Sequence, residues 1–192
     1  MDDRGALIGE PLALDLINTR PIDPSGRADL IATPRRLAAW LALQDDRMPT
    51  AARGLTPGPA DLAALHAVRA AAEAVVRALL DDDEPPRSAL RELTAAQRAA
   101  PSVRELAWDG SAVTAEPCRA GPPEAILAAV FAEAVTDLLT GSGLEKVREC
   151  EAADCVMLFR PAHPRRRWCS PARCGNRARV ARYYQRHKPP VG

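Results

Sequence analysis

The chain has 192 residues, of which 47% are hydrophobic and 27% charged, a composition that excludes bulk disorder and suits one globular core with a small appended unit. The net charge of +1 conceals two unlike parts: residues 1–143 carry 14 Arg and Lys against 21 Asp and Glu, whereas residues 144–192 carry 12 against 4. The resulting net charges of −7 and +8 indicate a basic tail that faces a polyanion. Residues 1–20 contain no apolar run that suits a signal peptide or a membrane span, so we expect a cytoplasmic protein without membrane contact.

The first element expected is a short helix in the apolar segment at residues 11–19, which contains the polar residues Asp15 and Asn18. Two interpretations of this pair stay open. Either they line a pocket for an effector, or they cap the helix or lie at the surface, which is the more common arrangement.

Three longer helices are expected next. In residues 32–44, Thr33 is placed as an N-cap and Pro34 occupies the first helical position, which tolerates its fixed φ and missing N–H. Residues 55–80 form the longest periodic stretch, with most apolar side chains on one stripe. Residues 88–100 follow an acidic loop and predict a more exposed helix.

The periodicity then changes from helical to alternating. In residues 103–115, Asp109-Gly110 between two short runs is typical of a two-residue hairpin turn. A strongly apolar helix is expected at residues 122–143, and the charge of the chain changes sign after it. We expect Trp40 and Trp108 to lie in the core.

Four of the five cysteines lie in the C-terminal part, in two pairs of identical spacing: Cys150 with Cys155, and Cys169 with Cys174. Two such pairs separated by a loop are typical of a tetrahedral metal site, because each pair forms a turn that offers two thiolates. Zinc is the favoured ion. A site closed by four thiolates leaves no position for an activated water, so we expect the zinc to be structural.

Three other interpretations of these cysteines stay open: disulfides, an iron–sulfur cluster, or four unrelated buried thiols. Disulfides suit an oxidising compartment, and the sequence carries no export signal. His163 lies between the two pairs and is an alternative ligand, but its place between prolines favours a solvent-facing loop. Cys118 stands apart and is expected to be a spare thiol.

The run RRRWCSPARCGNRARV, residues 165–180, resembles the CGNR zinc-finger family through its CGNR tetrapeptide and the preceding Trp-Cys-Ser. LALDLINT (12–19) and TPRRLAAWL (33–41) resemble the helical ABATE domain that usually precedes this finger. The resemblance implies a bacterial, stress-associated transcription regulator whose zinc ligands are the four paired cysteines. The chain departs from the family in the turn after Phe159, which reads RPAHPRRR, and at Arg179, where a lysine is common.

A last helix is expected beyond the cysteines, with Asn176 as its N-cap. At 100° per residue its arginines form one stripe, while Val180 and Tyr184 lie on an adjoining face that suits packing on the zinc site. The residues expected to contact nucleic acid are Arg165, Arg166, Arg167, Arg177, Arg179, Arg182 and Arg186. In the alternative that stays open, these arginines keep the helix soluble or pair with the acidic N-terminal part.

Together these patterns predict a mainly α protein: a helical ABATE-like domain with a short β-hairpin (1–143) and a zinc-ribbon-like module that ends in a helix (144–192). The sequence has no Gly-rich phosphate loop, metalloprotease motif or nucleophile motif, so we expect no enzyme. We expect a zinc-binding transcription regulator that prefers DNA to RNA, with a homodimer and a small-molecule effector of the N-terminal domain as further expectations. The alternatives are an RNA-binding protein and a protein-interaction module that does not bind nucleic acid.

Overall fold

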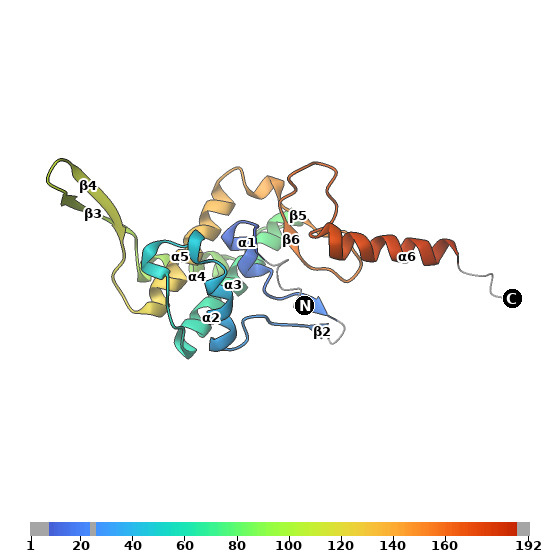
Figure 1. The fold of residues 1–192 in the computed structure, drawn as a ribbon, viewed down its shortest axis with the longest axis horizontal. Helices are drawn as coiled ribbons and strands as arrows, with labels where there is room; N and C mark the ends of the chain where they lie inside the picture. Colours follow the sequence, from blue (N-terminus) through green and yellow to red (C-terminus); the bar gives the residue numbers. More distant parts are fainter. Residues whose placement is uncertain (1–7, 24–25, 188–192) are drawn as a thin grey trace.

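The structure is a computed structural model that describes residues 8–23 and 26–187. A helical body lies between two projections, a β-hairpin at one end and a single helix at the other (Figure 1). The mainly α fold expected from the sequence is confirmed. Within the described ranges, every helix is too short or too polar to cross a lipid bilayer.

Three long helices form the body. They are α3 (Pro59–Leu80), α4 (Arg87–Ala99) and α5 (Pro123–Thr140), and each packs against the other two. The short helix α1 (Leu12–Ile17) lies against α3 and α5, and α2 (Pro34–Ala42) lies against α3. The shorter helices therefore close the open sides of a three-helix arrangement.

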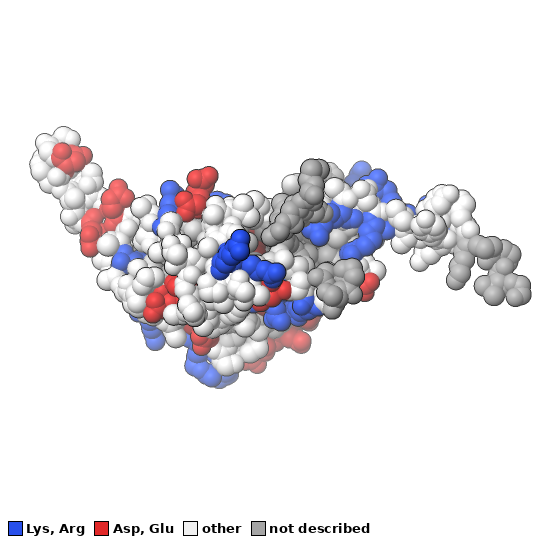
Figure 2. Space-filling view, turned by 60° about the horizontal axis from the view of Figure 1, so that its bottom comes forward, with Lys and Arg blue, Asp and Glu red and all other residues white. Residues whose placement is uncertain are grey.

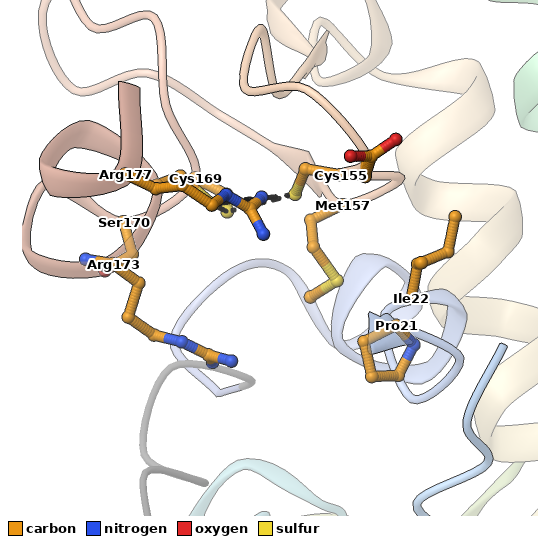
Figure 3. Close-up of a pocket in the computed structure, with 10 residues that line it drawn as sticks. Pro21, Ile22, Cys155, Met157, Cys169, Ser170, Arg173 and Arg177 are labelled. Carbon is orange, nitrogen blue, oxygen red and sulfur yellow. Dashed lines mark hydrogen bonds between the residues drawn. The ribbon is translucent and has the colours of Figure 1, made fainter. Parts of the chain in front are cut away.

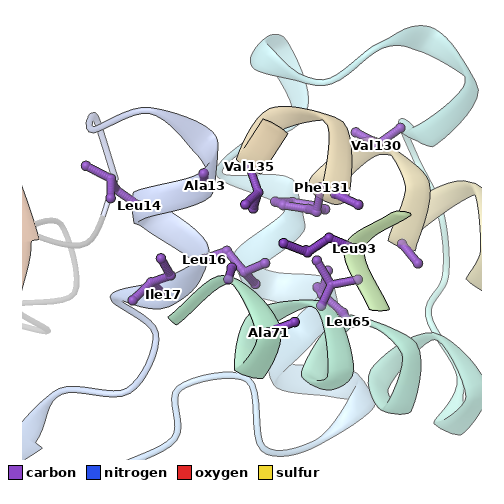
Figure 4. Packing of buried hydrophobic residues seen from close by; sticks show 14 of the residues in the cluster. Ala13, Leu14, Leu16, Ile17, Leu65, Ala71, Leu93, Val130, Phe131 and Val135 are labelled. Atoms are coloured by element: carbon purple, nitrogen blue, oxygen red, sulfur yellow. The ribbon is translucent and has the colours of Figure 1, made fainter. Parts of the chain in front are cut away.

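The core lies where these helices meet (Figure 4). Leu16 of α1, Leu65 of α3, Leu93 of α4 and Phe131 and Val135 of α5 are all buried there. Burial of side chains of this size stabilises the fold by about 1.5–3 kcal/mol each. Alanines of α3 and α5 fill the narrower gaps, which explains how a chain with few aromatic residues packs its core.

Helix α2 begins where the sequence predicts. The hydroxyl of Thr33 accepts a hydrogen bond from the backbone N–H of Arg36 (3.3 Å), and Pro34 is the first helical residue. Trp40 is buried, and its ring centroid lies 5.5 Å from that of Phe131. The expected cap and the expected core position of Trp40 are both confirmed.

Strands β3 (Val103–Trp108) and β4 (Val113–Cys118) form the projecting hairpin as an antiparallel pair. The hairpin is confirmed, but its turn is not the predicted two-residue type, because residues 109–112 all lie between the strands. The Asp109 carboxylate accepts hydrogen bonds from the backbone N–H groups of Ser111 (2.8 Å) and Ala112 (2.9 Å), which stabilises this longer loop. The core position expected for Trp108 is wrong, since the strand leaves the body and the side chain is 66% exposed.

The C-terminal part contains the antiparallel strands β5 (Arg148–Glu149) and β6 (Leu158–Phe159) and the final helix α6 (Asn176–Arg186). The expected cap at Asn176 is wrong. The chain enters α6 through the π-helical turn η5 (Pro171–Gly175), whose N-cap Ser170 accepts a hydrogen bond from the N–H of Arg173 (3.2 Å). The remaining short elements are β1 (Ile22–Asp23), β2 (Gly26–Arg27), η2 (Asp45–Arg47), η3 (Thr50–Ala52) and η4 (Leu144–Lys146).

Asn18 joins the helical body to the C-terminal part. Its side-chain amide donates to the carbonyl of Leu158 (2.8 Å) and accepts from the N–H of Leu158 (2.9 Å), and both bonds are buried. Leu158 and Val147 also belong to the same hydrophobic cluster as the body helices. Asn18 therefore takes the place of a neighbouring strand beside β6.

Asp15 is also buried and structural. Its carboxylate accepts hydrogen bonds from the backbone N–H groups of Gly9 (3.0 Å) and Glu10 (3.1 Å) and pairs with Arg47. Burial raises the pKa of Asp15, although the bonds from Arg47 and the two N–H groups oppose that rise. Asp15 and Asn18 are therefore buried structural residues, so the expectation that they lie at the surface is wrong and the structure gives them bonding partners instead of a pocket.

Candidate metal centre and nucleic-acid interface

The four paired cysteines meet in space. The Sγ atoms of Cys155, Cys169 and Cys174 are separated by 3.8 Å (155 to 169), 3.6 Å (169 to 174) and 3.7 Å (155 to 174). Cys150 completes a group whose four sulfurs all lie within 4.8 Å of one another. Zinc binds thiolates at about 2.3 Å in a tetrahedron, which separates the sulfurs by about 3.8 Å. The cluster therefore fits one structural zinc ion.

The same distances argue against two of the other interpretations. A disulfide holds its sulfurs at about 2.05 Å, and all five cysteines of the chain are free thiols in the structure. An iron–sulfur cluster binds its thiolates to different iron atoms and so needs a wider group of sulfurs than one that closes around a single ion.

The protonation of the thiols shows what the ion would supply. Hydrogen bonds from the Cys155 and Cys169 thiols lower the pKa of Cys150. The bond to Cys150 raises the pKa of Cys155 to about 11, and bonds to Cys150 and Cys155 raise the pKa of Cys169 as well. Without a cation, the Cys155 and Cys169 thiols therefore resist ionisation next to Cys150. A bound divalent ion reverses this balance, because it stabilises all four thiolates.

Local turns position each sulfur. Cys150 follows β5 and donates its N–H to the carbonyl of Met157 (3.0 Å), and the N–H of Cys155 reaches the carbonyl of Ala152 (3.2 Å). The backbone N–H of Cys169 donates to the sulfur of Cys150 (3.3 Å), as backbone groups do around thiolate ligands. Cys174 lies in the π-helical turn η5, so the fourth sulfur is placed by the entry into α6.

A small hollow of about 200 Å³ adjoins the cysteines (Figure 3). Pro21 and Ile22 of the body face Cys155 and Met157 across it. The Arg177 guanidinium donates to the sulfur of Cys174 (3.7 Å), and its charge offsets part of the net −2 that a zinc ion with four thiolates carries. Arg177, the arginine of the CGNR tetrapeptide, thus stabilises the cysteine group by a hydrogen bond and by its charge.

The structure separates the predicted nucleic-acid residues into two sets. Arg166 is turned into the C-terminal part: its guanidinium lies 4.6 Å from the Phe159 ring centroid and pairs with Glu10 (3.4 Å). Arg167 pairs with Glu151. Arg166 and Arg167 pair with carboxylates, although the Arg167 side chain stays exposed. Five other arginines are exposed and form no ion pair among the described residues, namely Arg165, Arg177, Arg179, Arg182 and Arg186.

Helix α6 projects from the module into solvent (Figure 1). The expected packing of its apolar face on the zinc site is wrong, because Val180, Tyr183 and Tyr184 are 54%, 55% and 68% exposed. The Arg182 guanidinium, nearly two turns into the helix, lies 6.0 Å from the Trp168 ring centroid. Among the described residues of α6, all except the half-buried Ala178 are exposed, so most of its surface is open to a partner.

Sequence reasoning missed Glu10 as a residue of this site. Its carboxylate accepts a hydrogen bond from the N–H of Arg160 (2.8 Å) and pairs with Arg166. The partners lie about 150 positions apart in the sequence, so no local pattern could have indicated the contact. The pairing of residues that are distant in the chain is a property of the folded molecule alone.

Comparison with known families supports both resemblances found in the sequence. Residues 10–142 match the ABATE family, described as "Putative stress-induced transcription regulator", and residues 146–187 match the CGNR zinc finger. No curated protein is similar enough to match the chain. The second match covers all four clustered cysteines, so the family and the sulfur geometry indicate the same ion independently.

Proposed function

Since the chain belongs to the ABATE family and ends in a CGNR zinc finger, we propose that it is a transcription regulator whose zinc module binds duplex DNA. The observation that carries the proposal is the exposed basic surface of α6 and its surroundings. From residue 155 to the last residue the chain contains ten Arg and Lys and no Asp or Glu. Such a surface neutralises phosphates, although Arg166 and Arg167 pair with the carboxylates of Glu10 and Glu151.

The ligand assignment is part of this proposal. Cys150, Cys155, Cys169 and Cys174 hold the zinc ion, and their support is the sulfur spacing. The ion fixes the turn that begins α6, because Cys174 lies in that turn. Zinc therefore acts on nucleic-acid binding indirectly, by fixing the direction in which the helix projects.

The arginines of α6 are available for phosphates. In the described part of the chain, neither Arg177, Arg179, Arg182 nor Arg186 pairs with a carboxylate. The side chains of Arg179, Arg182 and Arg186 instead reach backbone carbonyls one turn earlier in the helix, at 3.2–3.4 Å. Such weak contacts exchange readily for phosphate oxygens, which form charge-assisted bonds.

Duplex DNA suits this helix better than duplex RNA. The major groove of B-DNA is about 12 Å wide and admits an α-helix, whereas the major groove of A-form RNA is too deep and narrow for side chains to read. The eleven residues of α6 make a rod of about 16 Å, which is long enough to lie across that groove. The exposed tyrosines offer stacking surfaces, so single-stranded RNA is the competitor to test.

Fluorescence anisotropy tests the proposal directly. Zinc-quantified protein is titrated into labelled random duplex DNA and random RNA over a salt series. We expect tighter binding to the duplex, with a slope of log affinity against log salt near −5 for about six neutralised phosphates. Absence of binding at low salt with one zinc ion per chain would instead favour a protein-interaction module.

A charge-reversal variant assigns the binding surface. Arg179→Glu combined with Arg182→Glu is expected to abolish DNA binding without changing zinc content or helix content. The matched control is Arg91→Glu with Arg98→Glu, the same change in charge on exposed positions of α4. Equal affinity of the α6 variant and the wild type would exclude α6 as the DNA-binding surface.

We further propose that the ABATE domain senses an apolar molecule that carries an acid group. A cavity of about 590 Å³ lies beside α2, within the size range of small-molecule sites. Arg35 at its rim has no ion pair in the described part of the chain, so its charge is available to an anion. Leu30 lines the cavity and also packs against the cysteine cluster, which links it to the zinc module. The lining residues are Ile8, Leu30, Thr33, Arg35, Arg36, Ala39, Trp40 and Leu43.

The fluorescent probe anilinonaphthalene sulfonate has this chemistry, because it joins an aromatic body to an anion. We expect it to bind one site per chain, and decanoate to displace it. Arg35→Glu with Arg36→Glu should abolish that binding, whereas Arg91→Glu with Arg98→Glu should leave it intact. Binding that survives the change of both α2 arginines would reject this site, and the DNA proposal would stand unaffected.

A further inference from the structure

The hollow beside the cysteine cluster gives small molecules access to its sulfurs. Cys155, Cys169 and Cys174 line one side of it, and Pro21 and Ile22 of the body face them (Figure 3). Its volume of about 200 Å³ is several times the roughly 30 Å³ that one water molecule occupies in the liquid. A molecule as small as hydrogen peroxide therefore has room to approach the sulfurs.

The four cysteines of the cluster differ in their exposure. Cys150 and Cys174 are only 6% and 7% exposed, whereas Cys155 and Cys169 are half-buried. Cysteines that are buried among apolar groups are inert, and reactive cysteines are partly exposed and lie near positive charge. An oxidant in the hollow therefore meets Cys155 and Cys169 first.

The charges around the hollow favour the reactive form of a cysteine. Arg173 and Arg177 line it, and the Arg177 guanidinium lies 3.7 Å from the sulfur of Cys174. Asp154 is the only acid among the described residues that line it, so positive charge prevails there. Positive charge stabilises thiolates, which are the species that attack an oxidant. Zinc ligands are thiolates as well, so the zinc-loaded chain holds these sulfurs in the reactive form.

Cys155 and Cys169 are also placed to react with each other. Their sulfurs lie 3.8 Å apart, so a disulfide at about 2.05 Å needs an approach of about 1.8 Å. Both residues lie in loops, where small backbone shifts allow such an approach. The sulfurs of Cys169 and Cys174 are slightly closer, at 3.6 Å, but Cys174 is nearly buried and belongs to the helical turn η5.

We propose that Cys155 and Cys169 are an oxidation site, at which hydrogen peroxide joins the two cysteines in a disulfide and so releases the zinc ion. One thiolate attacks a peroxide oxygen, the O–O bond breaks and hydroxide leaves, which gives a sulfenic acid. The second thiolate attacks the sulfenic sulfur, forms the S–S bond and expels another hydroxide. Together the two sulfurs lose two electrons, which reduce one molecule of peroxide.

The disulfide changes the module beyond the two cysteines. Cys150 and Cys174 remain as ligands, which are too few to close a tetrahedral site. Without the ion, Cys174 no longer ties the turn η5 to the other sulfurs, so the direction of α6 is no longer fixed. Oxidation should therefore also weaken the binding of duplex DNA, and this consequence alone rests on the proposed function.

Peroxide treatment of the full-length, zinc-loaded protein tests the oxidation site. We expect the chain to release one zinc ion and lose two thiols for each peroxide consumed, as a chromogenic zinc indicator and a thiol reagent measure. Mass spectrometry after alkylation and proteolysis should find Cys155 joined to Cys169. Dithiothreitol with added zinc should restore both thiols and the ion. Cys118→Ser, which removes the thiol outside the cluster, should release zinc at the wild-type rate.

A variant that keeps all four ligands tests access through the hollow. Ile22→Trp places a larger side chain at the hollow and should slow the release of zinc several-fold. The matched control is Leu90→Trp on α4, because Leu90 and Ile22 are similarly exposed, at 42% and 39%. Circular dichroism and zinc content before treatment show that both variants have folded. Release from Ile22→Trp at the wild-type rate would reject the hollow as the route of the oxidant and with it the proposed site.

Reduced glutathione in the same solution serves as the reference thiol. Retention of zinc after the glutathione has been oxidised would overturn the proposal. A disulfide between another pair of cysteines or between two chains would overturn it as well. None of these measurements uses nucleic acid, so the oxidation site and the proposed function can fail separately. If the oxidised, zinc-free chain kept its affinity for duplex DNA, the oxidation site would stand and its coupling to α6 would be rejected.

Discussion

Asn18 shows how one side chain sets the relation between two parts of the chain. Its amide satisfies both the N–H and the carbonyl of Leu158, which a further strand would otherwise pair. In the sequence it is only a polar residue in an apolar segment, where capping and pocket-lining are the usual interpretations. Its actual partner lies 140 positions away, so the sequence could not indicate this role.

Asn18→Ala should therefore lower the free energy of unfolding by about 3 kcal/mol, because it leaves two buried backbone groups without partners. Urea denaturation at neutral pH measures the loss. Asn176→Ala, at an exposed position, is the matched control and should change stability by less than about 0.5 kcal/mol. A loss below about 1 kcal/mol in the Asn18 variant would mean that water replaces the amide.

The ion pair between Asp29 and Arg69 should make the stability of the fold depend on pH. Burial raises the pKa of Asp29, but Arg69 donates two hydrogen bonds to its carboxylate (2.8 and 2.6 Å) and its charge adds to them, so the pKa falls below the ordinary 3.8. A carboxyl whose pKa is lower in the folded state stabilises the fold above the unfolded pKa. That stabilisation is lost as the pH falls through the folded pKa.

Asp29→Asn should cost about 2–3 kcal/mol at pH 7, because it leaves the buried Arg69 charge without its carboxylate. The difference from the wild type should persist down to about pH 4 and shrink below it. Urea denaturation at several pH values checks this course. A difference that stays constant below pH 3.8 would show that the ion pair does not stabilise the fold.

Helices and strands could be predicted from the sequence where nearby residues determine their ends. Thr33 and Pro34 mark the start of α2 because a cap and a first-turn proline act within four residues. The position of the hairpin followed from its alternating pattern, but not its direction away from the body. The apolar character of Trp108 alone places it in the core, whereas its exposure shows that a large apolar residue can also lie on a projecting hairpin.

The candidate site was also only partly predictable from the sequence, as helix α6 shows. The cysteine spacing predicted the metal group, because ligand pairs form turns from local sequence. It could not predict that α6 begins in a π-helical turn or that its apolar side chains remain in solvent. Those features depend on the direction in which the helix leaves the module, which local sequence does not encode.

Cys169→Ser should reduce zinc binding to below one ion per chain and disorder the C-terminal part, residues 144–192. Zinc contributes on the order of 10 kcal/mol to the folding of comparable small units. Most of the far-UV helix signal should remain, because α3, α4 and α5 lie in the body. Limited proteolysis should cut the variant near residue 148 and spare the Cys118→Ser control. Loss of the body helices together with the zinc would contradict this separation.

In the whole molecule, the two parts share a core despite their different families. Val147 and Leu158 belong to the hydrophobic cluster of the body helices, and Arg77 of α3 donates to the carbonyl of Val156 (2.9 Å). A boundary at residue 143 is still a prediction. If the chain is cut there, the C-terminal part loses Asn18 and exposes apolar side chains that the body otherwise buries.

A peptide of residues 144–192 should therefore bind zinc about 10- to 100-fold more weakly than the intact chain, as is usual when the surroundings of a metal site are removed. Competition with a chromogenic chelator measures both affinities under the same conditions. The zinc affinity of the intact chain with Asn18→Ala should lie between these two affinities. Equal affinity of peptide and intact chain would show that the zinc module folds independently of the body.

The net charges of −7 in residues 1–143 and +8 in residues 144–192 give the molecule an electric dipole, although its total net charge is only +1. In Figure 2, acidic side chains mark the hairpin end and basic side chains gather where the C-terminal projection leaves the body. The field of a polyanion exerts a torque on such a dipole, so the molecule turns its α6 end forward before the first contact. Salt screens this orientation and should slow association more than it speeds release. If the partner is a polyanion, as proposed, the chain therefore approaches it with its basic end first, although the net charge is only +1.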